Sequence, residues 1–411
     1  MTTPTILIVG TCDTKADEID FMADCIRNAG GVSLLMDVSI LRDSRLSPDF
    51  TKDDVAAAAG TTNAEIVALG SESPAMAKTA EGASKLAARL QAEGRIDGIV
   101  ILGGTMGTDL SLDVAMALPV GVPKVVISTV AFSPLIPADR IAPDLIMVLW
   151  AGGLYGLNEM SKAALRNACG SVVGAARIAT KRDRSRPIVA ISSLGLSALT
   201  YMATLVPELE KRGYEAAVFH ATGMGGRAMA TLAQKGELVA IFDLCQQEMA
   251  NFFNGSRVNA GADRLHAPGI PRVVGPAGLD MIDALAAEPI PPALSHHEFY
   301  EHNRLITCAL ATDEERAAAA KFIAGKLAEA DAPTVLLLPN QGIGDWDRED
   351  GPLHNPEALA VMCQAFRESI VDPVELRELD CHINDPLYVE TALAIFDRWV
   401  ADGIVPPGAT T

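Results

Sequence analysis

Short apolar runs bounded by glycine alternate with helical patterns along the whole chain. They include TILIVG at 5–10, DGIVILGG at 97–104, PKVVIST at 123–129 and PIVAISSLG at 187–195. Continuous apolar runs of this length are typical of strands buried on both faces, and strands that alternate with helices imply parallel sheets with right-handed crossovers. The pattern predicts an α/β fold with mostly parallel sheets.

The chain reads as two similar halves joined by a charged stretch, KRDRSRP at 181–187. With 411 residues it is too long for one ordinary core, so we expect two Rossmann-like domains, 1–183 and 184–411. LPVGVPKVVIS in the first half echoes HAPGIPRVVGP in the second, as an internal repeat or as shared α/β grammar. Ligands should bind beyond the carboxyl ends of the strands, in a cleft between the domains.

Composition excludes several classes of protein. The formal charge of -19, without a basic run, disfavours binding to nucleic acid or to anionic membranes. No apolar run approaches membrane-spanning length, so we expect a soluble, cytoplasmic protein. The seven cysteines form no C-x-x-C pair, which argues against a disulfide framework or a zinc ribbon.

The first candidate anion site is the loop GTCDTKADE, which leads into a helix after the first strand. It offers the hydroxyls of Thr11 and Thr14, the carboxylate of Asp13 and the ammonium of Lys15 at a helix amino terminus. The alternative is an ordinary capped helix, since acidic residues at 17 and 18 already use the helix dipole. Cys12 in this loop leaves open a third chemistry, hydrolysis by an activated thiolate.

The second candidate site is GGTMGT at 103–108, again between a strand and a helix. Gly103, Gly104 and Gly107 let backbone N–H groups approach an oxyanion, while Thr105 and Thr108 add hydroxyl donors. The spacing is neither that of a Walker loop nor that of a dinucleotide fingerprint. Three glycines and two threonines exceed what a turn needs, so we expect contact with a ligand.

The third candidate site is FHATGMGGRAMATL at 219–232. Thr222, Gly223, Gly225 and Gly226 leave a strand and enter a helix, and they resemble a phosphate cradle as much as a tight turn. We expect this loop to pair with GGTMGT of the other half across one cleft. The following strand ends at Asp243, at the distance at which an acid reads a ribose in Rossmann units.

Further polar residues cluster near the carboxyl terminus. In DCHINDP, His382, Asn384 and Asp385 lie where the last strand should end, either as a functional cluster or as a helix cap. NQGIGDWDREDGPLHNP at 340–356 is long enough for a lid or a binding loop. HHEFYEH at 296–302 is interpreted as a polar connection rather than a metal site.

The motifs GTCDTKADE, GGTMGT, LPVGVPKVVIST, FHATGMGG and HINDP, in this order, resemble the Tm-one-like ATP-binding domain family over essentially the whole chain. The resemblance implies two Rossmann-like domains, self-association as a homodimer or larger homo-oligomer, and binding of ATP with magnesium near the glycine loops. It marks as site residues Thr11, Asp13, Thr14, Lys15, Gly103, Gly104, Gly107, Thr108, Thr222, Gly223, Gly225, Gly226, Asp243, Glu248, His382, Asn384 and Asp385. One departure is that Cys245, Gln246 and Gln247 replace hydroxyl-bearing residues of the family.

Two functional hypotheses follow. The first is a nucleotide-dependent enzyme that acts on a small anionic metabolite, with Asp13, Asp243, Glu248 and His382 as acid, base or magnesium-orienting groups. The second is a noncatalytic protein that senses a nucleotide or another anion and engages a protein partner. The sequence names neither the metal nor the substrate.

Overall fold

The computed structural model describes residues 3–180, 183–196 and 198–409. The chain divides into two compact units, Met1–Arg182 and Asp183–Thr411. Positions 181 and 182 of the predicted linker lie outside the described residues.

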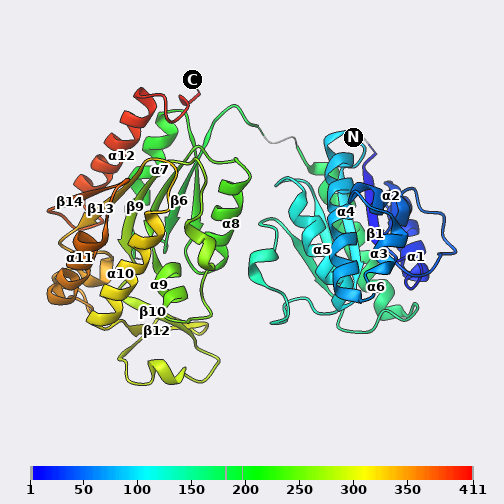
Figure 1. Ribbon diagram of the computed structural model, residues 1–411, viewed down its shortest axis with the longest axis horizontal. Coiled ribbons are helices and arrows are strands. Elements are labelled where there is room, and N and C mark those ends of the chain that lie inside the picture. Colours follow the sequence, from blue (N-terminus) through cyan, green and yellow to red (C-terminus); the bar gives the residue numbers. More distant parts are fainter. Residues whose placement is uncertain (1–2, 181–182, 197, 410–411) are drawn as a thin grey trace. The chain divides into compact units, whose positions relative to one another are not determined.

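The N-terminal unit is built on a parallel sheet flanked by helices (Figure 1). The sheet has five strands, all parallel, in the order β2-β1-β3-β4-β5. The strands are β1 (Thr5–Gly10), β2 (Val32–Asp37), β3 (Gly98–Gly103), β4 (Lys124–Ser128) and β5 (Ile146–Leu149). The α-helices are α1 (Ala16–Asn28), α2 (Lys52–Ala58), α3 (Asn63–Ala68), α4 (Glu72–Ala92), α5 (Thr105–Ala117) and α6 (Glu159–Ile178). α1 and α6 pack on one face of the sheet, and α2, α4 and α5 pack on the other.

The C-terminal unit contains a six-stranded, fully parallel sheet of order β14-β13-β9-β8-β6-β7 and a small antiparallel sheet of order β10-β12-β11. The parallel strands are β6 (Ile188–Ser193), β7 (Glu215–His220), β8 (Ala240–Cys245), β9 (Arg272–Ala277), β13 (Thr334–Pro339) and β14 (Val374–Leu379). The antiparallel strands are β10 (Met281–Leu285), β11 (Phe299–Glu301) and β12 (Ile306–Leu310). The α-helices are α7 (Met202–Lys211), α8 (Met224–Gln234), α9 (Gln247–Phe253), α10 (Asp313–Leu327), α11 (Pro356–Ser369) and α12 (Pro386–Ala401).

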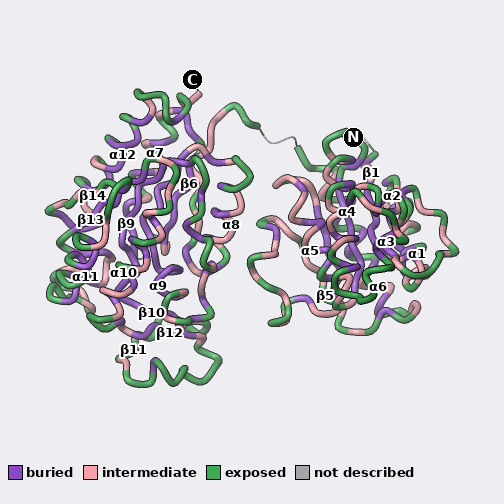
Figure 2. Tube along the Cα trace, in the orientation of Figure 1, coloured by how far each residue is buried: buried purple, intermediate pink, exposed green. Residues whose placement is uncertain are grey.

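The apolar pattern explains how each sheet is covered. In β1, Leu7 and Val9 face the core beneath α4 and α5, whereas Ile6 and Ile8 face α1 and α6. β3, β4, β8 and β9 are buried along their whole length, which is why they read as continuous apolar runs (Figure 2). In the second unit, α7 and α12 cover one face of the parallel sheet, and α8 to α11 cover the other.

The prediction of two α/β, Rossmann-like domains with mostly parallel sheets is confirmed. The small antiparallel sheet was not predicted, because its strands are short and HHEFYEH contains no apolar alternation. Residues 299–301 of that stretch form the edge strand β11. β5 was also missed, since its four residues lie on the edge of the sheet and are partly exposed.

The two units share the order of their first four strands, because β2-β1-β3-β4 corresponds to β7-β6-β8-β9. GGTMGT follows β3, the third strand of its unit, whereas FHATGMGG follows β7, the second strand and an edge of its sheet. The two glycine loops therefore occupy different topological positions in their units.

Candidate functional site

The first two predicted loops meet at one cavity of about 710 Å³ in the N-terminal unit. They follow β1 and β3, neighbouring strands from which the chain crosses over in opposite directions along the sheet. At such a point the connections diverge and leave a crevice outside the carboxyl ends of the strands, where α/β proteins bind ligands. The predicted site residues that line the cavity are Thr11, Asp13, Thr14, Lys15, Gly103, Gly104, Thr105 and Gly107.

Asp37, the last residue of β2, holds the β1–α1 loop in place. Its buried carboxylate accepts hydrogen bonds from the backbone N–H of Cys12 (3.2 Å) and of Ser39 (2.9 Å). Ser39 in turn accepts a hydrogen bond from the backbone N–H of Asp13 (3.0 Å). Sequence reasoning missed Asp37 and Ser39, although an acidic residue at the end of the second strand is a Rossmann signal. Here that acid fixes a loop, and the side chain of Asp37 does not line the cavity.

The β3–α5 loop brings a helix amino terminus to the cavity. Gly104 is the N-cap of α5 and carries no capping side chain, and no acidic residue lies in the first turn. The first N–H groups of a helix have no acceptor within the helix, so they attract an anion. Gly103 is required for packing, because a Cβ there would overlap the backbone of Gly107, whereas Gly104 faces open space apart from Thr129.

The two threonines of this loop have different environments. Thr105 is exposed and lines the cavity. Thr108 is buried, and its hydroxyl lies 2.7 Å from the hydroxyl of Ser128 at the end of β4. The structure therefore does not bring Thr108 to the cavity, in contrast to the prediction from the sequence.

The cavity also has an apolar wall, which was not predicted. It is formed by residues after β2 and by α3 and α4, namely Val38, Ile40, Leu41, Val67, Ala75 and Met76. Leu41 is 73% exposed and Val67 is 41% exposed, so this wall offers hydrophobic surface that the unit itself leaves uncovered. No local sequence pattern marks this wall, because its residues come from three separate segments.

Two cationic and two acidic side chains line the cavity. Lys15 and Arg42 supply cations, and Asp13 and Glu72 supply carboxylates. The Lys15 ammonium lies 5.3 Å from the centre of the exposed Tyr155 ring. The Thr11 and Thr14 hydroxyls are 2.9 Å apart beside it. The loop therefore gathers a cation, two hydroxyls and one carboxylate at the polar end of the cavity.

Cys12 lies at the centre of the first loop but is fully buried. Burial, together with the nearby carboxylate of Asp37, raises the pKa of its thiol far above the ordinary value. Its sulfur lies 3.7 Å from the carbonyl oxygen of Gly10, to which the thiol donates. Because a nucleophilic cysteine needs a lowered pKa and access to solvent, the thiolate chemistry left open by the sequence has no support here.

The third predicted loop has an internal anion at its helix amino terminus. The carboxylate of Glu248 accepts hydrogen bonds from the backbone N–H groups of Gly223 (2.6 Å) and Gly226 (3.0 Å). A Cβ on Gly226 would overlap this carboxylate, and a Cβ on Gly225 would overlap the backbone of His220. The glycines are thus explained by the close approach of protein atoms. The Thr222 hydroxyl pairs with the ring of His220 (3.1 Å).

Arg264 joins Glu248 to Asp243 in a buried network that sequence reasoning missed. Its guanidinium contacts both carboxylates, and all three side chains are at most 2% exposed. Burial acts to lower the pKa of Arg264, but the two facing carboxylates more than offset this and hold it above the ordinary value. Asp243 also accepts a hydrogen bond from the Ser192 hydroxyl (2.8 Å). Asp243 and Glu248, the two carboxylates of this network that were predicted to be catalytic, thus have their ion-pair and hydrogen-bond partners within the protein.

The predicted relation between Asp243 and the third loop is wrong in its topology. β8, which contains Asp243, pairs with β6 and β9, and β7 lies on the other side of β6. Asp243 is therefore not at the end of a strand adjacent to β7, and the comparison with a ribose-reading acid does not apply.

The DCHINDP residues lie at the opposite edge of the same sheet, after β14. Asn384 accepts a hydrogen bond from the backbone N–H of Thr200 (2.8 Å) and donates one to the carbonyl of Ala198 (3.1 Å). The Asp385 side chain accepts one from the backbone N–H of His382 (2.9 Å). His382 and Asp385 also line a second cavity of about 420 Å³.

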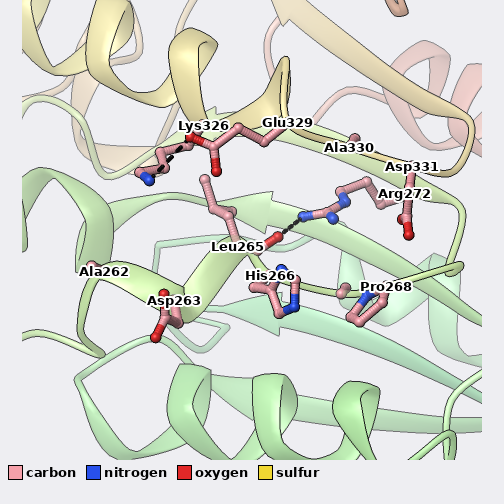
Figure 3. Close-up of a pocket in the computed structure, with 11 residues that line it drawn as sticks. Ala262, Asp263, Leu265, His266, Pro268, Arg272, Lys326, Glu329, Ala330 and Asp331 are labelled. Atoms are coloured by element: carbon pink, nitrogen blue, oxygen red, sulfur yellow. Dashed lines mark hydrogen bonds and ion pairs between the residues drawn. The ribbon is translucent and has the colours of Figure 1, made fainter.

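A third, smaller cavity of about 120 Å³ lies at the amino end of β9 (Figure 3). Arg272 projects into it and donates to the carbonyl of Leu265, while its Nε has no partner among the described residues. Burial lowers the pKa of this guanidinium. The cavity lies at the amino ends of the strands, away from the edge at which α/β proteins bind ligands. Its carboxylates, Asp263, Glu329 and Asp331, outnumber the cations Arg272 and Lys326.

The described residues contain no cluster of three or more histidine, cysteine or acidic side chains that could hold a metal ion. Among them, no helix combines the length and the hydropathy that crossing a membrane requires.

Comparison with known proteins identifies the family of the chain. Residues 4–181 match the N-terminal domain, and residues 186–400 the C-terminal domain, of the "Uncharacterised protein family (UPF0261)". The chain belongs to the UPF0261 family. UPF0261 proteins of Brucella suis and Clostridium tetani are 48% and 32% identical to it, over 98% and 92% of this chain and 98% and 95% of theirs.

The Tm-1 resemblance is supported by a plant relative of this UPF0261 protein. The ToMV resistance protein Tm-1(GCR237) of Solanum lycopersicum is 29% identical over 97% of this chain, which matches 55% of the tomato protein. The solved structures that match the chain are only distantly similar to it. A 2-epimerase structure from Listeria monocytogenes, titled as a putative UDP-N-acetylglucosamine 2-epimerase, covers both chains fully but has 12% identity and a TM-score of 0.25. A likeness this low carries no argument about ligand or function.

Proposed function

We propose that the N-terminal unit of this UPF0261 protein binds a nucleotide in the 710 Å³ cavity, with ATP as the nucleotide that the family resemblance implies. One observation carries the proposal: the β1–α1 and β3–α5 loops line the same cavity, at the crossover point of the parallel sheet. Cavities of roughly 300 to 1,000 Å³ are typical of small-molecule sites.

The polar end of the cavity suits phosphate. Lys15 supplies positive charge, Thr11, Thr14 and Thr105 supply hydroxyls, and the uncapped amino terminus of α5 supplies N–H groups. The carboxylate of Asp13 and the nearby hydroxyls are hard oxygen ligands of the kind that Mg²⁺ accepts together with water and phosphate oxygens. Magnesium therefore fits the residues present when it arrives with the nucleotide.

The apolar end of the cavity suits a base. Val38, Leu41, Val67 and Met76 form a hydrophobic wall, and Arg42 lies at its edge. A site with one anion-binding end and one apolar end fits an amphipathic ligand such as a nucleotide better than it fits a small inorganic anion.

Catalysis is the second part of the proposal: the bound nucleotide serves a reaction on a small anionic metabolite. Phosphoryl transfer depends mainly on positioning and charge stabilisation, so a site without a nucleophilic side chain is compatible with it. A noncatalytic nucleotide sensor would show binding without turnover.

Calorimetric titration of the full chain with ATP, with and without magnesium, tests binding. We expect saturable binding that weakens at least about tenfold in Gly104→Val, where a side chain would occupy the mouth of the α5 amino terminus. Gly170→Ala is the matched control, since an added Cβ there meets no atom. Equal affinity in Gly104→Val and wild type, or no binding by wild type, would remove the site. Nucleotide turnover with a panel of carboxylic and sugar acids then separates the enzyme from the sensor.

A further inference from the structure

The second cavity, of about 420 Å³, lies at the carboxyl ends of β13 and β14 in the C-terminal unit. Two segments that the sequence singled out separately converge there, the long loop 340–356 and the DCHINDP stretch. We propose that this cavity is a binding site for a small, uncharged polyhydroxylated ligand, with His354 Nε2 accepting a hydrogen bond from a ligand hydroxyl. The proposal is independent of nucleotide binding by the N-terminal unit.

Asp347 organises both segments. Its buried carboxylate accepts hydrogen bonds from the backbone N–H groups of Ile343 (2.8 Å) and Gly344 (3.1 Å). The same carboxylate lies 3.1 Å from Nε2 of His382. A Cβ on Gly342, whose φ is +133°, would overlap both His382 and Asp347, so glycine permits this close packing. The wall of the cavity is therefore built by specific contacts.

The protonation of both histidines follows from their backbone partners. The backbone N–H of Asn384 donates to Nδ1 of His382 (3.1 Å), so the ring proton of neutral His382 lies on Nε2, facing the carbonyl of Gly344 (2.9 Å). His354 has the opposite arrangement, because its Nδ1 lies 3.0 Å from the carbonyl oxygen of Asp347 and must donate. Nε2 of His354 is left as an acceptor with no partner in the described part of the chain.

The charge of the cavity selects against anions. Asp347, Glu349 and Asp385 contribute carboxylates, and Arg348 is the guanidinium that faces them. The Arg348 guanidinium forms ion pairs with Asp345 (3.1 Å) and Asp385 (3.6 Å). The α11 amino terminus is also occupied, since Asn355 caps it by accepting from Ala358 N–H (3.0 Å). A phosphate or carboxylate would therefore meet net negative charge in this cavity.

The remaining lining groups match hydroxyls. Asn340 and Gln341 present amides, which both donate and accept hydrogen bonds; the Gln341 amide nitrogen also donates to Asp380 (3.0 Å). Pro356 and Leu359 add apolar atoms to the lining. Amides, carboxylates and one imidazole acceptor can engage several ligand hydroxyls at once.

Histidine ring resonances of the labelled full-length chain, titrated with myo-inositol and D-glucose, test the proposal, with D-gluconate and inorganic phosphate as anionic comparators. We expect a saturable shift of the His354 signal with at least one neutral polyol, and weaker binding of both anions. His354→Asn retains a donor for the Asp347 carbonyl but lacks the Nε2 acceptor; followed through the ring resonance of His382, which also lines the cavity, it should bind about two- to tenfold more weakly.

His266→Asn is the matched control, because His266 is an exposed histidine of the small cavity, and it should bind as wild type does. If His354→Asn fails to fold, Asn340→Ala, at an exposed position, takes its place with the same expectation. Tighter binding of gluconate or phosphate than of the polyols, no shift with either polyol, or wild-type affinity in the folded variant would overturn the assignment. ATP affinity should not change in any of these variants, so the two proposals fail separately.

Discussion

The carboxylate of Glu248 accepts a hydrogen bond from the backbone N–H of Gly226 at 3.0 Å, in the place where an external anion would bind at a helix amino terminus. The dipole of α8 is therefore used by a side chain of the protein. Since Arg264 and Asp243 complete the network, charges of the protein itself occupy the anion-binding position of the third predicted loop.

Removing Glu248 should destabilise the C-terminal unit strongly. Glu248→Ala leaves the Gly223 and Gly226 N–H groups without their acceptor and takes one of two carboxylates from buried Arg264. Breaking a buried ion pair costs about 3–5 kcal/mol, so we expect a loss of this size in the free energy of unfolding, measured with urea. Glu215→Ala, at an exposed position of β7, should change it by less than about 0.5 kcal/mol. A loss below about 1 kcal/mol would contradict a central role for the network.

The two threonines of the β3–α5 loop should separate binding from stability. Thr105 is exposed in the cavity, so Thr105→Ala should weaken ATP affinity several-fold and leave the melting temperature unchanged. Thr108→Val removes one of two partners of the buried Ser128 hydroxyl, which keeps only the backbone N–H of Val130 (3.0 Å), and this should cost about 1–3 kcal/mol of stability with little effect on affinity. Calorimetry and thermal unfolding of both variants test this pair, and the reverse assignment would show that the loop is oriented differently in solution.

The thiols should react unequally with a disulfide reagent. Cys25 is half-buried, while the other six cysteines are buried. Burial raises the pKa of Cys169 to about 12 and that of Cys363 to about 11. We expect one comparatively fast thiol in the native protein at pH 8, absent in Cys25→Ser, and all seven thiols after denaturation. Rapid modification of Cys12 would revive the thiolate hypothesis.

The free energy of unfolding should fall as the pH rises through the pKa of the Asp280 carboxyl group. Burial raises its pKa to about 6, although Arg316 acts in the opposite direction and Asp347 and Asp283 add to the rise. A carboxyl with a raised folded pKa stabilises the fold at low pH and loses that contribution between its unfolded value near 4 and about 6. Relative to Asp280→Asn, the wild type should therefore lose about 2–3 kcal/mol of stability from pH 4 to 7. Parallel curves for the two proteins in urea titrations would show that Asp280 is not buried as described.

Much of the fold could be predicted from sequence because local patterns encode it. Continuous apolar strands, glycine-bounded turns and alternating helices specify parallel sheets with covered faces. The antiparallel sheet escaped prediction because strands of three to five residues, such as Phe299–Glu301, carry too few positions for a period to show.

The candidate site could be predicted only in part. Loops rich in glycine and hydroxyl residues gave the polar end of the cavity, since those residues are neighbours in the chain. Ser39 and Leu41 follow β2, whereas Val67 lies in α3 and Met76 in α4, so no local pattern links these three segments. Arg264 was missed for the same reason: nothing around it in the sequence marks it as the cation that faces Asp243 and Glu248.

By itself, the sequence determined two α/β halves and the strand ends at which polar loops gather. Tertiary structure alone decided which loops meet and which charges are already satisfied. The sequence has glycines before both α5 and α8. In the structure the amino terminus of α5 opens into a cavity, whereas the carboxylate of Glu248, 22 residues from Gly226 in the chain, covers the amino terminus of α8. The difference arises because hydrogen bonding and burial depend on distances in space, which the order of residues does not give.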